Sequence, residues 1–404
     1  MIEGELHVDG GVIAYVGAPR PALDAEIYDC GGNLIVQGLC NAHAHSAMTL
    51  FRGIADDLPL DKWLNDCIFP MEAHCGEEEL YWGTKLAELE YARGGITAVA
   101  DMYGDCASAF EGTGFHLTMV GHQNDLTVST EKVLYALKDN YQKYHGKGRI
   151  DFMLGAHAEY TCSDGLLYGL SDLAADLEAP VNIHLSETLK EVGECDVRRG
   201  MSPVAFFHKI GLFDYGGLAA HCVWCDKDDL ALLQDKGVTP VVNSASNLKL
   251  ASGFAPIPSM LAQGLLPALG TDGAASNNAL SILHEMRLYA TLSKGVMKDA
   301  AVVTAEQTLD AATQNGYRAL GLSGGEIKRG NPADFWIADL SAPCMQPDVS
   351  AVKSLTYSAD TSVVLATVAG GRRVYDKGNY AVGERVEDIY ANCRRLKKKL
   401  LSKI

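Results

Sequence analysis

The sequence predicts an α/β protein with a (β/α)8 barrel of the TIM type and a small β-sandwich domain built from both termini. Three observations support this prediction. Short apolar runs alternate with helical stretches through the middle of the chain, several of these runs end in polar residues, and both ends of the chain carry short β-type segments. Repeated strand and helix units form parallel sheets, and a barrel of this type carries its active site at the carboxyl ends of its strands.

The first apolar run, from Leu34 to His45, ends in the histidines His43 and His45. Side chains two apart on a strand point to the same side, so both imidazoles can converge on one point. An isolated His-x-His pair is more often two ordinary histidines near a loop. This pair has partners further along the chain, and a divalent metal is the simplest point of convergence.

Seven further apolar runs alternate with helical stretches up to about residue 323. A helix from about Glu77 to Arg93 precedes the first of them, and the pair Gly94-Gly95 ends this helix. The seven runs are Ile96–Met102, His116–Val120, Ile150–His157, Pro180–His184, Leu218–His221, Val238–Asn243 and Leu265–Asp272. Eight strands with intervening helices close a barrel, so we assign residues 34–323 to it.

Three of these runs end in residues that could join the histidine pair. His184, His221 and Asp272 each stand at the carboxyl end of a run. In a barrel these ends meet at one face, so the side chains are expected to lie together. Imidazole and carboxylate ligands suit zinc or iron.

Both ends of the chain predict β structure. Residues 1–33 contain alternating runs broken by glycine, which predict a small hairpin. The C-terminal part adds the β-rich segments Asn331–Asp339, Ser362–Ala369 and Arg373–Asp376. We expect residues 1–33 and 324–404 to build one composite β domain beside the barrel.

The composition narrows the classes of partner. The net charge of −17 argues against a nucleic-acid partner, because a surface that binds nucleic acid needs clustered Lys and Arg. It favours a small neutral or cationic substrate. No apolar run reaches membrane-spanning length and Met1–His7 lack a secretory signal pattern, so we expect no membrane partner and a cytoplasmic protein. The eleven scattered cysteines predict reduced thiols, and the basic run Arg394–Lys399 predicts a solvated amphipathic terminal helix. The sequence leaves the oligomeric state open, a homo-oligomer included.

Six motifs, in barrel order, resemble those of the amidohydrolase superfamily. The similarity is to the branch of aminohydrolases that includes S-adenosylhomocysteine/methylthioadenosine deaminases, triazine hydrolases and guanine deaminases. The motifs are Asn41–Gly53, Asp61–Leu64, His184–Thr188, Ala220–Cys222, Asn243–Leu250 and Gly270–Asn278. They span nearly the whole predicted barrel, and the terminal β domain matches as well.

The resemblance implies a single metal centre. The implied ligands are His43, His45, His184 and Asp272. Zn²⁺ is the expected ion, with Fe²⁺ or Mn²⁺ as alternatives, and His221 stands beside it. Relatives with two metals need a bridging carboxylate or modified lysine at the end of the fourth strand, where this chain reads Gly155-Ala156-His157. One metal is therefore expected, and Glu159 is the only nearby residue that could contradict this.

The expected reaction is hydrolytic deamination of an aromatic amidine carbon. A divalent metal lowers the pKa of a bound water, and Asp272 can take the proton as the water attacks. Glu187 would protonate a ring nitrogen and relay a proton to the departing ammonia, and His221 would orient the nucleophile or hydrogen-bond the developing oxyanion. Each residue also has a structural interpretation: Glu187 as a helix-start carboxylate, His221 as a core histidine, and Asp272 as a cap of the following turn.

The expected substrate pocket draws on three further residues. Glu72 falls where similar nucleoside deaminases place a glutamate on the ribose hydroxyls, although an exposed helix residue is about equally compatible with the sequence. His157 matches a family histidine that contacts substrate, and Trp63 could wall the purine or belong to the core. Relatives that accept S-adenosylhomocysteine commonly carry an arginine after the third strand, whereas this chain reads Gly121-His122-Gln123. Adenosine, 5′-deoxyadenosine and methylthioadenosine therefore become candidates comparable with S-adenosylhomocysteine.

Three alternatives accompany the adenosine-type deaminase. The same site could act on another heteroaromatic amine or halide, such as guanine, a pterin or a triazine. A non-catalytic barrel would be expected to have lost metal ligands, and this chain keeps them. A cytidine-type zinc deaminase would use His157-Ala-Glu159 with Cys222-Val-Trp-Cys225, but that assignment leaves the His-x-His pair unexplained.

Overall fold

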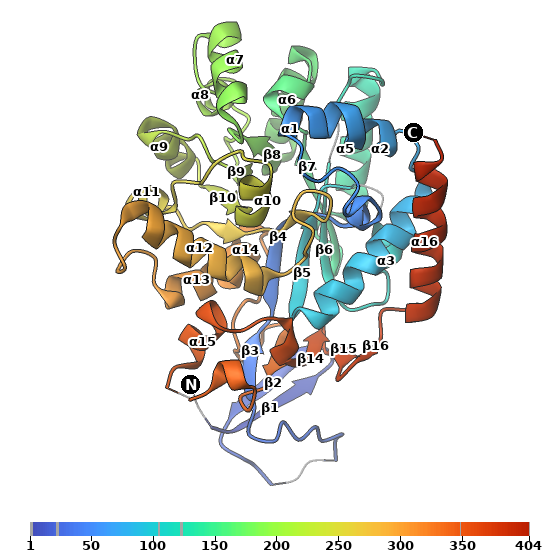
Figure 1. Cartoon of the computed structure of the whole chain (residues 1–404), viewed down its shortest axis with the longest axis vertical. Coiled ribbons are helices and arrows are strands. Elements are labelled where there is room, and N and C mark those ends of the chain that lie inside the picture. The colour runs from blue at the N-terminus through green and yellow to red at the C-terminus, as the bar shows by residue number, and fades with distance from the viewer. Residues whose placement is uncertain (1–2, 22–23, 104–105, 122–123, 348, 404) are drawn as a thin grey trace.

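Nine parallel strands form the central sheet of the computed structural model, which describes residues 3–21, 24–103, 106–121, 124–347 and 349–403 (Figure 1). Their order in the sheet is β11-β10-β9-β8-β7-β6-β5-β4-β12. The strands are β4 Leu39–His45, β5 Ile96–Asp101, β6 His116–Val120, β7 Ile150–Gly155, β8 Val181–Leu185, β9 Gly217–His221, β10 Val238–Val242, β11 Ala268–Leu269 and β12 Asp272–Gly273. Each predicted apolar run overlaps one of these strands, except the last run, which covers β11 and the first residue of β12.

The last predicted run is divided between β11 and β12. β11 pairs with β10 and β12 pairs with β4, so the sheet curls until its two ends approach each other. Gly270 lies at the division because a Cβ there would come within 2.4 Å of Asn243 Oδ1 and 2.7 Å of His43 Cβ. The parallel, curled sheet is consistent with a TIM-type barrel.

Helices alternate with these strands and cover the outside of the sheet (Figure 1). The longer ones are α3 Glu77–Arg93, α5 Thr130–Tyr144, α6 Asp164–Leu177, α7 Leu189–Arg199, α9 Lys227–Asp235 and α12 Ile282–Met297. α3 has the predicted bounds, and its end is fixed by Gly95, which has φ +74° and packs against Trp336. A residue with a side chain would be strained at that φ and would collide with the indole ring.

The run from Leu34 to His45 is two strands, whereas the sequence predicted one. β3 (Leu34–Gln37) pairs antiparallel with β13 (Phe335–Ala338), and only β4 enters the central sheet. The chain crosses between the sheets at Gly38, where a Cβ would lie 1.9 Å from Thr97 Oγ1. β3 is half-buried and β4 is buried, so apolar residues stand on both sides of Gly38 and hide the crossing.

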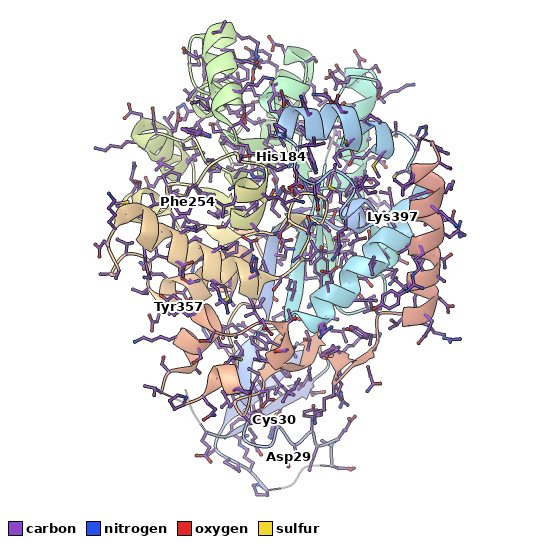
Figure 2. The ribbon with its side chains drawn as sticks, in the orientation of Figure 1. Asp29, Cys30, His184, Phe254, Tyr357 and Lys397 are labelled. Atoms are coloured by element: carbon purple, nitrogen blue, oxygen red, sulfur yellow. The ribbon has the colours of Figure 1, made fainter. Side chains whose placement is uncertain are left out.

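Strands from the N-terminal part of the chain and from residues 335–380 come together at one pole of the molecule (Figure 1). β3 and β13 belong to a five-stranded sheet with β14 (Val364–Ala369), β15 (Arg372–Asp376) and β16 (Asn379–Tyr380). The predicted N-terminal hairpin is β1 (Glu5–Asp9) and β2 (Val12–Gly17), and its Ile13 packs with Ala333 and Phe335. Figure 2 shows Asp29 and Cys30 at this pole and His184 near the other.

The C-terminal helix α16 (Val386–Leu401) is amphipathic, as predicted, and it lies along α3 (Figure 1). It buries one apolar face, and Lys399 Nζ lies 2.7 Å from Glu79 Oε1 of α3. The described residues include all eleven cysteines, and every one is a free thiol. No described helix combines the length and the apolar character that crossing a membrane requires.

Candidate metal centre and surrounding pocket

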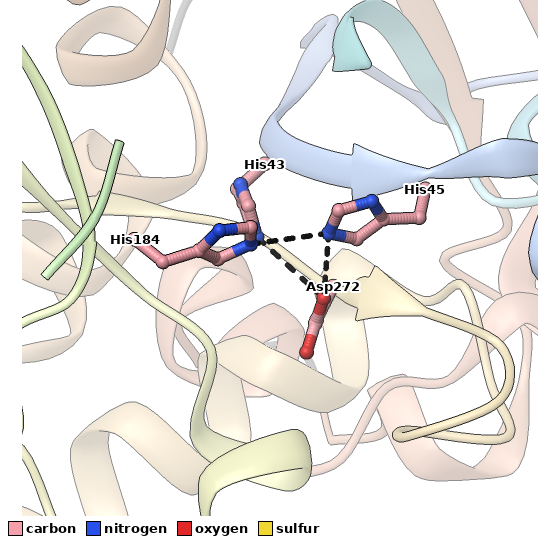
Figure 3. A group of neighbouring side chains, drawn as sticks. All are labelled: His43, His45, His184 and Asp272. Atoms are coloured by element: carbon pink, nitrogen blue, oxygen red, sulfur yellow. Dashed lines mark hydrogen bonds and ion pairs between the residues drawn. The ribbon is translucent and has the colours of Figure 1, made fainter. Parts of the chain in front are cut away.

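Three histidines and one aspartate converge at the carboxyl ends of three strands (Figure 3). The residues are His43 and His45 of β4, His184 of β8 and Asp272 of β12, and their potential ligand atoms all lie within 4.8 Å of one another. Asp272 Oδ1 lies 3.5 Å from His43 Nε2 and 3.3 Å from His45 Nε2. All four residues are buried, so this group is a metal-binding site as the sequence predicted.

Outer hydrogen bonds turn the ligand atoms of this group inward. His184 Nδ1 lies 2.8 Å from the carbonyl oxygen of His157, which can only accept, so Nδ1 carries the proton and the Nε2 lone pair faces the group. Asp272 Oδ2 accepts from Ser246 Oγ at 2.6 Å and Ser276 Oγ at 2.8 Å, which leaves Oδ1 toward the histidines. His45 Nε2 and His184 Nε2 lie only 3.3 Å apart, an arrangement of facing nitrogen atoms that a shared cation stabilises.

The protonation states of His43, His184 and Asp272 suit a divalent cation, whereas the hydrogen bond and charge of Asp272 outweigh burial at His45 and raise the pKa of His45. Burial lowers the pKa of His43 to about 4 and holds the pKa of His184 well below its usual value, so both imidazoles are neutral at pH 7. Burial alone would raise the pKa of Asp272, but His43 and His45 hold it well below its ordinary value. Neutral imidazoles and an ionised carboxylate are the forms that bind zinc, iron or manganese.

Glu187 and His221 stand next to the metal group. His221 Nε2 lies 3.8 Å from Glu187 Oε2, and Glu187 Oε1 accepts from Ser252 Oγ at 2.9 Å. His221 Nδ1 lies 2.8 Å from Asn247 Oδ1, which fixes the ring and makes Nδ1 the protonated nitrogen. Burial raises the pKa of Glu187, while His221 opposes this rise. Burial therefore favours the protonated form of the Glu187 carboxyl group more than water does.

The helix-start interpretation of Glu187 does not fit the structure. α7 begins at Leu189 after the N-cap Thr188, and the acidic residue of its first turn is Glu191. The Glu191 carboxylate accepts the backbone N–H groups of Ser186 and Glu187, each at 2.8 Å. Glu191 therefore fixes the loop, and the Glu187 side chain is left to line the pocket.

A pocket of about 470 Å³ opens beside the metal group, and every predicted site residue except the fully buried His43 lines it. Its apolar wall comes largely from α1 (Leu60–Lys62), the π-helical turn Trp63–Ile68 and α2 (Phe69–Glu72). Trp63 is 5% exposed, and its Nε1 has no hydrogen-bond partner among the described residues. Trp63 is thus both a core residue and a wall of the pocket, which joins the two sequence interpretations.

Glu72 and His157 both line this pocket. The Glu72 Oε1 atom accepts a hydrogen bond from the Tyr103 hydroxyl, and burial raises the pKa of Glu72. His157 Nδ1 lies 2.7 Å from Thr161 Oγ1, and burial lowers the pKa of His157 to about 3. His157 therefore presents a neutral ring to the pocket, and Glu72 is not the exposed helix residue that the sequence also allowed.

Glu159, the residue that could have supplied a second metal ligand, is held elsewhere. Its fully buried carboxylate lies 2.5 Å from Arg199 Nε through Oε1 and pairs with Arg198 through Oε2. Among the described His, Cys, Asp and Glu residues, the one group with metal-binding spacing contains neither Glu159 nor Cys222 and Cys225. The structure therefore gives no support to a cytidine-type zinc site.

We expect Glu159→Gln to reduce the free energy of unfolding without changing metal content. Breaking a buried ion pair costs about 3–5 kcal/mol, and we expect about 2 kcal/mol here because Arg198 is 41% exposed and stays partly solvated. Urea unfolding gives the stability change, and elemental analysis gives the metal content. Glu194→Gln is the matched control, because Glu194 contacts Arg198 from the exposed side of α7. A loss of metal in Glu159→Gln alone would contradict the purely structural role.

Several residues that shape the site were not singled out from the sequence. Asp101, at the end of β5, accepts the backbone N–H groups of Ser46 and Tyr103, each at 2.9 Å. Its position at a strand end was the available sequence signal. The hydroxyl groups of Ser246 and Ser252 donate to residues 26 and 65 positions away, which spacing does not reveal, whereas Ser276 donates to Asp272 only four residues earlier. After the third strand, where the arginine of some relatives is missing, this chain has His122 and Gln123. Both lie outside the described residues.

Comparisons with known proteins confirm the resemblance. A 5-methylthioadenosine/S-adenosylhomocysteine deaminase from Moorella thermoacetica is 39% identical over 96% of this chain and 93% of its own length. A 5′-deoxyadenosine deaminase from Methanocaldococcus jannaschii is 39% identical over 88% of this chain and 87% of its own. The crystal structure of an adenosine deaminase from Xanthomonas campestris with bound zinc superposes with a TM-score of 0.94 and 32% identity, covering 98% and 93% of the two chains. Triazine hydrolase from Arthrobacter aurescens, at 22% identity and a TM-score of 0.89, shares the fold.

A sequence model of the amidohydrolase family matches residues 34–374 of this chain. The matched range contains the central sheet, all four residues of the metal group and the strands β13 and β14. This chain belongs to the amidohydrolase family.

Proposed function

We propose that this protein is a metal-dependent deaminase that converts an adenosine-type nucleoside to the corresponding inosine compound and releases ammonia. The observation that carries the proposal is the meeting of the metal group with Glu187 and His221 in one pocket. The relatives named 5-methylthioadenosine/S-adenosylhomocysteine deaminase and 5′-deoxyadenosine deaminase support an adenosine-type substrate. A small-molecule substrate of this kind is consistent with the net charge of −17, because a strongly negative protein repels polyanions.

The proposed cofactor is one Zn²⁺ ion, held by His43, His45, His184 and Asp272. Three imidazoles and a carboxylate suit zinc, and the zinc-bound structure from Xanthomonas campestris supports the choice over Fe²⁺ and Mn²⁺. When bound, such an ion lowers the pKa of a coordinated water toward neutrality and provides a nucleophile.

The residues around this centre divide the proton transfers between them. Asp272 is ionised, so it can accept the proton of the attacking water through its carboxylate. Burial raises the pKa of Glu187 and so favours its acid form, which can donate a proton to the ring nitrogen next to the amino-bearing carbon. Protonation makes that carbon electrophilic, and the carboxylates then return a proton to the departing ammonia.

His221 would orient the attacking water. Because its Nδ1 donates to Asn247, its Nε2 is available to accept a hydrogen bond from the nucleophile. Of the two roles that the sequence left open, this tautomer favours orientation of the water over donation to an oxyanion. The neutral His157 also lines the pocket, where it can contact the heteroaromatic ring.

Substrate recognition is assigned to Glu72 and Trp63. A carboxylate can accept from two vicinal hydroxyls at once, which suits the ribose of a nucleoside. Trp63 offers an apolar ring face to the purine and an indole N–H that has no partner among the described residues.

We expect Glu72→Ala to reduce kcat/KM for adenosine by about 100-fold and to leave that for the free base adenine nearly unchanged, because hydrogen bonds to a charged group contribute roughly 1.5–3 kcal/mol. Steady-state kinetics on both compounds measure the difference. An equal loss on adenosine and adenine would rule out the ribose role.

A deamination assay by ultraviolet absorbance tests the proposed function. The panel contains adenosine, 5′-deoxyadenosine, methylthioadenosine, S-adenosylhomocysteine, guanine and a pterin. We expect the highest kcat/KM on a member of the adenosine series. Turnover confined to guanine or the pterin would overturn the nucleoside assignment, and a metal-loaded protein that deaminates none of the six would overturn the proposed reaction.

We also infer that the curled sheet closes as an eight-stranded barrel and that both termini build one small β domain. The pairing of β11 with β10 and of β12 with β4 supports closure. The contact of Ile13 with Ala333 and Phe335 supports a single terminal unit from residues 1–33 and 324–404. Because β3 joins that unit, its inner boundary is better placed at Gly38 than at residue 34.

A further inference from the structure

Tyr103 lies between the metal group and Glu72, two residues beyond the end of β5. Its backbone N–H donates to Asp101 Oδ1 at 2.9 Å, and Asp101 Oδ2 accepts the N–H of Ser46, the residue after His45, at 2.9 Å. The Tyr103 ring meets the His45 ring edge-on, with centroids 5.8 Å apart and an interplanar angle of 84°. One buried carboxylate and one ring contact thus fix Tyr103 relative to the metal group.

The Tyr103 hydroxyl donates to Glu72 Oε1, 31 residues earlier in the chain. Among the described residues, no other group donates a hydrogen bond to the Glu72 carboxylate. Glu72 ends α2, the last element of the apolar wall, so this hydrogen bond ties the wall to the end of β5. The orientation of the Glu72 carboxylate therefore depends on a residue of the sheet and not on α2 alone.

The hydrogen bond approaches Glu72 from the side away from the site pocket. Glu72 lines both the site pocket and a second cavity of about 430 Å³, whereas Tyr103 lines only the second. The rest of the second cavity is mostly apolar, with Ala47, Leu50, Phe51 and Leu80 among its lining residues. Without the hydroxyl, the desolvated Glu72 carboxylate would lose its donor, and both its charge and its orientation would be less well held.

We propose that Tyr103 is a positioning residue for nucleoside recognition, which orients the Glu72 carboxylate so that Oε2 faces the ribose hydroxyls in the site pocket. This inference rests on the proposed function. Tyr103 acts through Glu72 and does not itself contact the substrate. Selection for a substrate with vicinal hydroxyls therefore depends on a residue outside the site pocket.

The test compares adenosine with 2′,3′-dideoxyadenosine in Tyr103→Phe. This variant keeps the ring that packs on His45 and removes only the hydroxyl. We expect kcat/KM for adenosine to fall by about 10- to 100-fold, mainly through KM, because a hydrogen bond to a charged group is lost. The value for the dideoxy compound should stay close to that of the unmodified enzyme. The combined variant Glu72→Gln with Tyr103→Phe should be no worse on adenosine than Glu72→Gln alone.

Tyr91→Phe provides the matched control. Tyr91 is a buried tyrosine of α3 whose hydroxyl lies 2.8 Å from Ser46 Oγ, next to the same metal ligand but without contact to Glu72. Tyr91→Phe should leave the ratio of kcat/KM for adenosine to kcat/KM for 2′,3′-dideoxyadenosine unchanged. If the unmodified enzyme prefers adenosine and Tyr103→Phe keeps this preference, the inference is overturned while the proposed function stands. An unmodified enzyme that deaminates neither compound would overturn the proposed function and the inference with it.

Discussion

Glu187→Gln should retain its fold and its metal while kcat falls by about 10²- to 10⁴-fold, the usual contribution of a general acid–base group. Glutamine keeps the length of the side chain and an oxygen that can accept from Ser252 Oγ, so the local packing is preserved. It has no acidic proton to give to the ring nitrogen. Stopped-time absorbance assays measure kcat, and elemental analysis measures the metal bound per chain.

The control for this variant is Glu194→Gln, the same substitution at an exposed position of α7. Glu194 faces away from the pocket, so kcat should be unaffected. A Glu187→Gln enzyme that keeps both its metal and most of its kcat would remove Glu187 from the proton-transfer scheme. Loss of metal in this variant would instead indicate that Glu187 maintains the metal group.

Dialysis against a chelator should abolish deamination, and a divalent ion should restore it at one equivalent per chain. The described pocket offers ionised and neutral side chains, but a free water with a pKa near 15.7 is a poor nucleophile at neutral pH. The metal-free protein should also melt at a lower temperature, because ligand binding at about 1,000-fold above Kd stabilises a fold by roughly 4 kcal/mol. Restoration with Zn²⁺, Fe²⁺ and Mn²⁺ in parallel identifies the most active ion.

Two variants sharpen this experiment. Asp272→Asn removes the charged ligand and should weaken metal binding, whereas His145→Asn changes a histidine that pairs with Asp151 on the exposed surface and should not. Two ions per chain at full activity would contradict the single-metal centre. Full activity in protein shown to be metal-free would contradict the proposed reaction itself.

The site residues at the strand ends were predictable because a buried apolar run and a polar functional residue adjoin each other there. In β8 and β9, His184 and His221 stand at or next to the end of the apolar strand, so the pattern that predicts the strand also marks the position of a site residue. The same reasoning failed at Gly38, where two strands of different sheets follow each other and only Gln37 and Gly38 interrupt the apolar residues. A one-dimensional pattern records burial but not the sheet in which a residue is buried.

The substrate side of the pocket was less predictable for a different reason. Residues 60–72 fold into a short helix, a π-helical turn and another short helix, which have no regular apolar period. Glu72 and Trp63 could therefore be proposed only by resemblance. The Tyr103 hydrogen bond to Glu72 and the Asp101 contacts join segments that sequence separation leaves unrelated.

Most of the apolar wall of the pocket is one continuous piece of chain between β4 and α3, whereas the metal group is drawn from β4, β8 and β12. Insertions, deletions or exchanges within this loop can reshape what enters the pocket while the catalytic machinery stays on the rigid sheet. New substrate preferences can therefore evolve through changes in this one segment while the residues of the metal group stay the same.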